Sequence, residues 1–291
     1  MATELECALL SGNIYQRTVR KPDGTYNANY FQLVPEPEGW SIAQASGQDL
    51  YQSNDATGFE AAAYTNGSEV VIAYAGTDTD QWQDLLTDAW VGVGGQIQVV
   101  EAALFFARVR AAFPDKTITF TGHSLGGGLA ALMGVFFNRP ATTFDPAPFR
   151  AAATMANALK IDLAIRAEGV VPDSQLASFV TGPEIPVEVR AIPILGWALS
   201  IMALTARPSA LGRVMVPTLI RGESQIKAIA TEGEFLTNAG TRLLRVFGGD
   251  IQLLRHGSPA HGALLGITGT SIALHAQSLL IALLGNESLR Q

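Results

Sequence analysis

The 291-residue sequence has little cysteine, little histidine and little charge. Its one cysteine, Cys7, has no partner for an intramolecular disulfide, so packing must hold the fold together. Cys7 lies in an apolar stretch, which predicts a buried thiol and not a reactive nucleophile. Only 15% of the residues are charged, with 19 basic against 26 acidic, and no basic block occurs. Because nucleic-acid binding depends on clustered Lys and Arg, we expect no nucleic-acid partner.

The sequence also shows no targeting or membrane-spanning segment. Glu4 and Glu6 stand where a secretory signal would carry positive charge. The longest uncharged apolar run, residues 192–206, contains Pro193 and falls short of the roughly 20 residues that a membrane span needs. We therefore expect a protein that is cytoplasmic or exported without a cleaved N-terminal signal.

Strands and helices alternate along the chain in the way typical of an α/β fold. Apolar segments 59–64 and 69–75 flank Asn66-Gly67, which predicts a β-hairpin. The following elements are expected to be a helix over 96–113, a strand over 117–121, a helix over 125–138, a strand over 141–144 and a helix over 151–168. This order indicates a mostly parallel central sheet covered by helices on both faces. No repeat or linker divides the chain, so residues 1–291 are expected to form a single domain.

Residues 121–130 carry the most informative motif. Gly122, Ser124 and Gly126 follow the predicted strand directly and open the predicted helix. This is the nucleophile-elbow pattern, in which the serine occupies a sharp strand-to-helix turn and the glycines give the backbone room to make it. Ser124 is therefore the expected nucleophile. The competing interpretation is a glycine-rich turn required only for close packing.

Acyl transfer needs backbone donors aimed at the developing oxyanion. The amide of Leu125, the residue after the nucleophile, is the expected first donor. Thr77 is the candidate for the second, because Gly76-Thr77-Asp78 closes an earlier strand and the glycine lets the backbone approach. The alternative is that these residues only end the strand and form a turn.

Two segments resemble the class 3 lipases, an α/β-hydrolase family. The resemblance rests on residues 71–78, on Trp82 and the acidic residues from 84 to 88, and on residues 121–127, and it covers roughly residues 59–145. The family usually has Arg where this chain has Ala75, which removes a charge beside the expected oxyanion donor. The resemblance implies an α/β-hydrolase fold and a triad in the chain order Ser, acid, His.

The chain has four histidines that could serve as the general base. His123 adjoins the nucleophile and would point away from the attacking side, so it is expected to pack structurally. His275 precedes a last amphipathic helix, much as the catalytic histidine of the class 3 lipases does, and it is the preferred base. His261 and His256 flank a turn and are the alternatives. As a pair they could suggest a metal site, but no third ligand is implied, so we expect no metal and no cofactor.

Two carboxylates compete for the acid of the triad. Glu184 follows the strand-like residues 176–181 and lies close to where class 3 lipases place their acid, although they normally use Asp. Asp145 ends the predicted strand 141–144 and resembles the acid of the pancreatic-type lipases. The alternatives are a solvated loop charge for Glu184 and a turn residue before proline for Asp145.

Between residues 185 and 245 the alternation of strands and helices fails. The apolar run 192–206 lies between Arg190 and Arg207 there, and Pro208 and Pro217 break the pattern after it. One interpretation is a core helix with loops. The other is a helical insertion that covers the site as a lid or touches a lipid surface.

These residues together predict a serine ester hydrolase that acts on lipid esters, such as an acylglycerol lipase or a phospholipase of the A type. Its expected partner is a lipid or ester substrate, at a membrane or emulsion interface. One alternative is a soluble carboxylesterase or thioesterase, which would share the same chemistry. The other is an inactive membrane- or partner-binding module on a hydrolase scaffold. Chain-length preference, headgroup and oligomeric state have no signal in the sequence.

Overall fold

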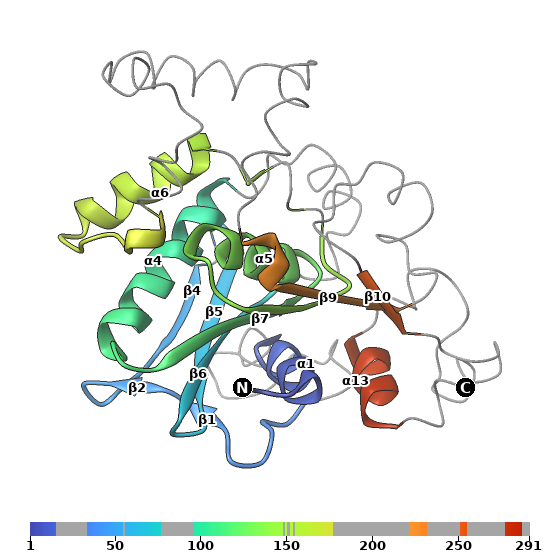
Figure 1. Ribbon diagram of the computed structural model, residues 1–291. Helices are drawn as coiled ribbons and strands as arrows, with labels where there is room; N and C mark the ends of the chain where they lie inside the picture. Colours follow the sequence, from blue (N-terminus) through green and yellow to red (C-terminus); the bar gives the residue numbers. More distant parts are fainter. Residues whose placement is uncertain are drawn as a thin grey trace, which may run out of the picture.

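A central sheet with helices on both faces dominates the computed structural model (Figure 1). This arrangement confirms the predicted α/β fold class. The structure describes residues 1–15, 34–54, 56–76, 96–147, 149, 152–153, 155–176, 222–231, 251–254 and 277–286.

The main sheet of the described chain has eight strands, in the order β1-β5-β6-β7-β8-β9-β10, with β4 also paired to β5. Strands β6 to β10 run parallel, whereas β5 is antiparallel to each of its neighbours. A separate small sheet pairs β2 with β3, and a short 3₁₀ helix, η3, precedes β9. The bounds are β1 (Ser41–Ile42), β2 (Gln44–Ala45), β3 (Gln48–Asp49), β4 (Tyr51–Asn54), β5 (Phe59–Thr65), β6 (Glu69–Tyr74), β7 (Thr117–His123), β8 (Ala141–Phe144), η3 (Glu223–Gln225), β9 (Ile226–Thr231) and β10 (Ile251–Leu254).

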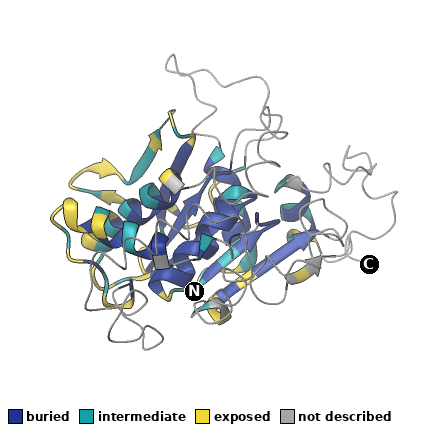
Figure 2. Cartoon of the chain, turned by 90° about the horizontal axis from the view of Figure 1, so that it is seen from above, coloured by how far each residue is buried: buried dark blue, intermediate teal, exposed yellow. Residues whose placement is uncertain are grey.

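Helices cover the sheet unequally (Figure 1). Helices α4 (Gln96–Ala112), α5 (Leu125–Phe137) and α6 (Met155–Ala167) lie on one side, and α1 (Glu4–Asn13) and α13 (Gln277–Gly285) lie on the other. Neighbouring residues of β6 therefore pack on opposite faces of the sheet. Ile72 belongs to the core under α4 and α5, whereas Val71 packs against α1. All six residues of β6 are buried, which explains why the strand after Glu69 is apolar without alternation. Figure 2 shows the interior of the described chain as buried.

Most of the predicted elements around the motif are confirmed. The hairpin forms from β5 and β6, and β7, α5 and β8 follow within one or two residues of their expected bounds. Helix α5 ends at Asn138, which has a φ of 48° and closes the helix with a left-handed residue.

Two expectations about the later chain need correction. Leu176, expected to begin a strand, is helical together with residues 174 and 175. The range 185–245, predicted as an insertion, includes β9, which pairs with β8 on one side and β10 on the other within the main sheet. The insertion therefore cannot extend through β9. Residues 192–206 lie outside the described residues.

Candidate active site

The turn between β7 and α5 has the geometry that the motif predicts. Ser124 has φ 58° and ψ −126°, a conformation that non-glycine residues rarely adopt. The surrounding backbone holds it there, since its N–H donates to Phe144 O at 3.0 Å and its carbonyl accepts from Ala147 N at 2.9 Å and from Gly128 N at 3.1 Å. Strain retained in this way at one serine is typical of a functional turn.

Two glycines make the turn sterically feasible. A Cβ on Gly122 would lie 2.3 Å from Gly126 O, and a Cβ on Gly126 would lie 2.1 Å from Tyr74 O. Both obstacles are backbone atoms, which cannot move aside as a side chain can. The glycines therefore let β7 and α5 approach each other and β6 closely, as the sequence motif requires.

Ser124 is buried and is the residue immediately before α5. Its Oγ makes no hydrogen bond to any described residue. Leu125 is the first residue of α5, so its N–H belongs to the group of amides that lack an acceptor within the helix. These amides and the helix dipole favour negative charge beside the serine.

The end of β6 reaches the same turn. Tyr74 pairs with Gly122 across the parallel β6–β7 register, so the chain leaves β6 beside the elbow. A Cβ on Gly76 would lie 3.0 Å from His123 O and 3.3 Å from Ser124 Cβ. Thr77, the predicted second oxyanion donor, is the next residue in the sequence and lies outside the described residues.

Asp145 and His123 form a buried polar cluster beside the elbow. Asp145 follows β8 with a φ of 41°, and its backbone N–H donates to Ile229 O at 2.8 Å. Its Oδ1 accepts a hydrogen bond from Thr231 N at 2.8 Å, and its Oδ2 lies 3.8 Å from His123 Nε2. These contacts join the carboxyl ends of β7, β8 and β9. They also give His123 the structural surroundings expected from the sequence.

The other predicted site residues, Glu184, His256, His261 and His275, lie outside the described residues. For His275 the structure describes the helix that begins two residues later. Gln277, the first residue of α13, donates from Nε2 to Ala8 O at 2.7 Å and to Ser11 Oγ at 2.8 Å, both on α1. The chain two residues after His275 is therefore fixed to the helix that packs under β7.

Sequence reasoning overlooked the residues after β9. Carboxyl ends of parallel strands meet at one edge of a sheet, and polar residues there commonly build the site. In the sequence, Glu232 and Glu234 come directly after Thr231, the last residue of β9. Residues 226–231 do carry a strand signal, since they are mostly apolar apart from Lys227 and have β-branched residues at both ends, but the predicted insertion spans them.

Cys7 takes no part in the chemistry. It is buried beside Phe144 and Leu280, as predicted, and burial raises the pKa of its thiol to about 12. At neutral pH the thiolate needed for nucleophilic attack is essentially absent.

Among the described residues, no group of three His, Cys, Asp or Glu side chains could hold a metal ion. No helix in the same residues is long and apolar enough to cross a membrane.

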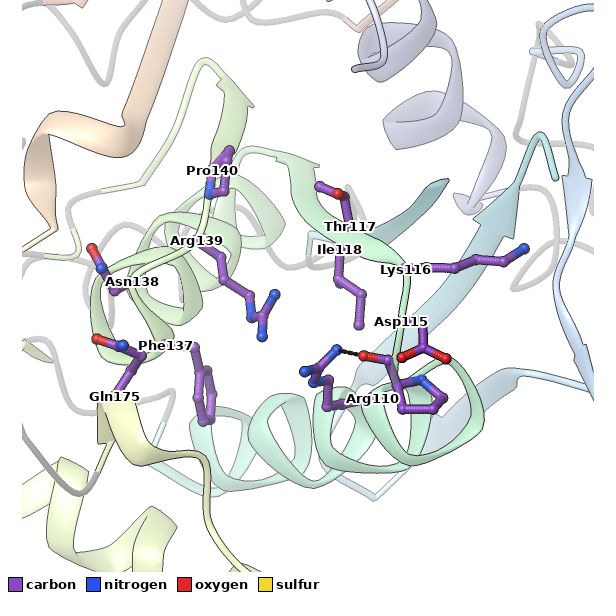
Figure 3. Close-up of a pocket in the computed structure, with 11 residues that line it drawn as sticks. Arg110, Asp115, Lys116, Thr117, Ile118, Phe137, Asn138, Arg139, Pro140 and Gln175 are labelled. Carbon is purple, nitrogen blue, oxygen red and sulfur yellow. Dashed lines mark hydrogen bonds between the residues drawn. The ribbon is translucent and has the colours of Figure 1, made fainter. Parts of the chain in front are cut away.

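The cavity drawn in Figure 3 lies at the opposite end of the strands from Ser124. It is open, has a volume of about 410 Å³, and is lined at the start of β7 by Thr117 and before β8 by Pro140. Its Arg139 already pairs with Asp173 at 3.3 Å. This cavity is therefore separate from the elbow and is no candidate for the catalytic site.

Comparisons with known proteins point to one group. The model of the Tle-like phospholipase domain, described as phospholipase-like, matches residues 6–170, which is more than half of the chain. Extracellular phospholipase A1 of Serratia liquefaciens is 37% identical over 141 residues, or 48% of this chain and 40% of that protein. Proteins named as the lipase ATG15 match shorter stretches: 48% identity over 48 residues in Mycosarcoma maydis and 50% over 40 residues in Candida glabrata. These cover 16% and 14% of this chain, and 9% and 8% of those proteins. The chain thus matches less than half the length of these relatives.

Proposed function

Because the chain belongs to the family of Tle-like phospholipase domains, we propose that it hydrolyses a carboxylic ester of a lipid, with Ser124 as the nucleophile. Membership of this family confirms the resemblance to lipases seen in the sequence. The observation that carries the proposal is the conformation of Ser124, held at positive φ between β7 and α5 with its hydroxyl at the start of the helix. This is the placement that a nucleophile elbow requires.

The proposed reaction proceeds in two steps through an acyl-enzyme. Ser124 Oγ attacks the ester carbonyl while a histidine, His275, takes its proton, and the backbone N–H groups of Thr77 and Leu125 stabilise the oxyanion. The C–O bond to the alcohol then breaks, and the histidine returns the proton to the leaving oxygen. Water attacks the acyl-enzyme by the same route and releases the acid. No cofactor takes part in either step.

The fold changes which carboxylate we prefer as the acid of the triad. Asp145 already accepts a hydrogen bond from Thr231 N and faces His123, so its carboxylate serves to join strand ends. Glu184 is a candidate because a strand is expected just before it, over residues 176–181. In the described chain the strand that follows β8 is β9 instead, which weakens that argument. We therefore favour Glu232 or Glu234, after β9, as the acid, with Glu184 and Asp145 as the alternatives.

Isosteric amide substitutions show which of these four carboxylates is the acid of the triad. We expect Asp145→Asn to keep kcat within about tenfold, because Asn still accepts from Thr231 N and tolerates a positive φ. The Glu→Gln variant at the true acid should lose about 10⁴-fold in kcat without a change in Tm, because the histidine loses its orienting charge. Kinetics and thermal melts of the four variants test this. A loss of that size in Asp145→Asn at unchanged Tm would assign the role to Asp145.

We propose phospholipid as the substrate and residues 192–206 as the segment that contacts it. The Serratia relative is named a phospholipase A1, and residues 192–206 form a long uncharged apolar run in the sequence, as is typical of a segment that contacts lipid. Both features favour an aggregated substrate over a soluble ester.

Substrate class is tested by comparing fatty-acid release from phosphatidylcholine vesicles and a triacylglycerol emulsion with hydrolysis of p-nitrophenyl butyrate. We expect activity on vesicles, and we expect polar substitution of Leu195, Trp197 and Leu199 together to reduce it at least about tenfold while the soluble ester is cleaved within about twofold of wild type. Activity on the soluble ester alone would indicate a carboxylesterase or thioesterase. No hydrolysis of any substrate would favour the binding module.

A further inference from the structure

Tyr15, just beyond the end of α1, links two backbone groups beside the nucleophile. Gly76 N–H donates to the Tyr15 hydroxyl at 2.8 Å, and that hydroxyl donates to His123 O at 3.3 Å. The Tyr15 ring also meets the His123 ring edge to face, with centroids 6.4 Å apart and an interplanar angle of 71°. One side chain thus joins the end of β6 to the last residue of β7.

Both bonded groups lie next to the expected oxyanion donors. Gly76 precedes Thr77 in the chain, and His123 precedes Ser124 and Leu125. Because its N–H is taken by Tyr15, Gly76 itself does not supply a donor to the substrate. The hydroxyl therefore sets the distance between the two backbone segments that carry the donors.

Helix α1 is a firm support for this hydroxyl. Leu10 and Ile14 are fully buried against the sheet, and Asn13 Oδ1 accepts a hydrogen bond from the Tyr64 hydroxyl at 2.8 Å. Thr121 of β7 adds a bond from Oγ1 to Cys7 O at 3.2 Å. A side chain anchored on such an element holds its partners more precisely than one on a loop.

We propose that Tyr15 is a positioning residue for the oxyanion hole, an inference that rests on the proposed function. Oxyanion donors accelerate acyl transfer because they are already in place when charge develops, so freedom in one donor segment slows the chemical step. Without the hydroxyl, Gly76 N–H and His123 O lose their shared partner and the end of β6 is no longer fixed to the elbow. Substrate binding, by contrast, needs neither bond.

The test compares Tyr15→Phe with Tyr64→Phe in the full chain. Each variant keeps its ring and removes one hydroxyl: that of Tyr15 bonds to Gly76 N and His123 O, and that of Tyr64 donates to Asn13 of α1. Each should therefore lower Tm. On p-nitrophenyl butyrate we expect Tyr15→Phe to reduce kcat about 10- to 100-fold with little change in KM. Its Ki for an alkyl boronic acid, which forms a tetrahedral adduct with the serine, should rise by a comparable factor. Tyr64→Phe should keep both values within about twofold of wild type.

The outcomes separate this inference from the proposed function. If Ser124→Ala is inactive but Tyr15→Phe and Tyr64→Phe both keep the wild-type kcat and boronate Ki, Tyr15 contributes only to stability and the inference is wrong. An equal loss in both tyrosine variants would likewise overturn it, because general loosening of α1 would then explain the effect. If Ser124→Ala keeps its activity, the proposed function fails first and the inference fails with it.

Discussion

Replacing Ser124 with alanine should abolish ester hydrolysis and leave the fold intact. Ser124 Oγ makes no hydrogen bond to the described residues, so its removal breaks no hydrogen bond there. Alanine also has a Cβ, like serine, and meets the same backbone strain at φ 58°. We therefore expect Tm within a few degrees of wild type and kcat reduced by at least about 10⁴-fold. Losses of this size follow when the nucleophile is removed from a catalytic triad whose members act together.

The measurement is initial-rate kinetics on p-nitrophenyl butyrate and on phospholipid vesicles, with a thermal melt of the same preparation. Ser53→Ala, an exposed serine on β4, is the matched control and should keep full activity. A Ser124→Ala protein that hydrolyses either substrate at the wild-type rate would remove the basis of the proposed mechanism.

Replacing His275 with alanine should have the second large effect. His275 lies two residues before the first residue of α13, Gln277, which fixes the start of that helix to Ala8 and Ser11 of α1. Helix α1 in turn packs against β7, the strand that leads to Ser124. We expect His275→Ala to lower kcat by at least about 10³-fold, because no other group would then accept the serine proton.

His256→Ala and His261→Ala are the controls for this substitution, because they remove the two other late histidines. Both should retain kcat within about threefold of wild type. Added imidazole should restore part of the activity of His275→Ala, because a free base can enter the space that the side chain leaves. Loss of activity in His256→Ala or His261→Ala, with His275→Ala active, would move the base to that position.

The sequence alone was sufficient to predict the elements that local residue patterns specify. An Asn66-Gly67 turn between two apolar runs predicts the β5–β6 hairpin because few other turns suit adjacent strands. The motif around Ser124 predicts the elbow because only glycine fits at the two closest approaches to neighbouring backbone. The hairpin turn and the contact of Gly122 with Gly126 O act within ten residues of the chain. The constraint on Gly126 comes from Tyr74 O on a neighbouring strand, but the motif that signals it is itself local.

Features that depend on distant contacts could not be predicted in the same way. The place of strand β9 beside β8 is fixed by pairing between distant residues, such as Ala141 with Ile226, and not by its own composition. Tyr15 bonds to residues 61 and 108 positions away, and nothing in its local sequence marks it. Its role becomes visible only once the ends of β6 and β7 are placed side by side.

The central claim, that Ser124 is the nucleophile, is tested most directly by covalent labelling. The folded protein is treated with an alkyl fluorophosphonate, digested and analysed by peptide mass spectrometry, with heat-unfolded protein as the control. We predict one adduct on the peptide containing Ser124, formed at the rate at which esterase activity disappears and absent after unfolding. Full inactivation with the adduct on another residue, or an active protein that resists labelling, would contradict it.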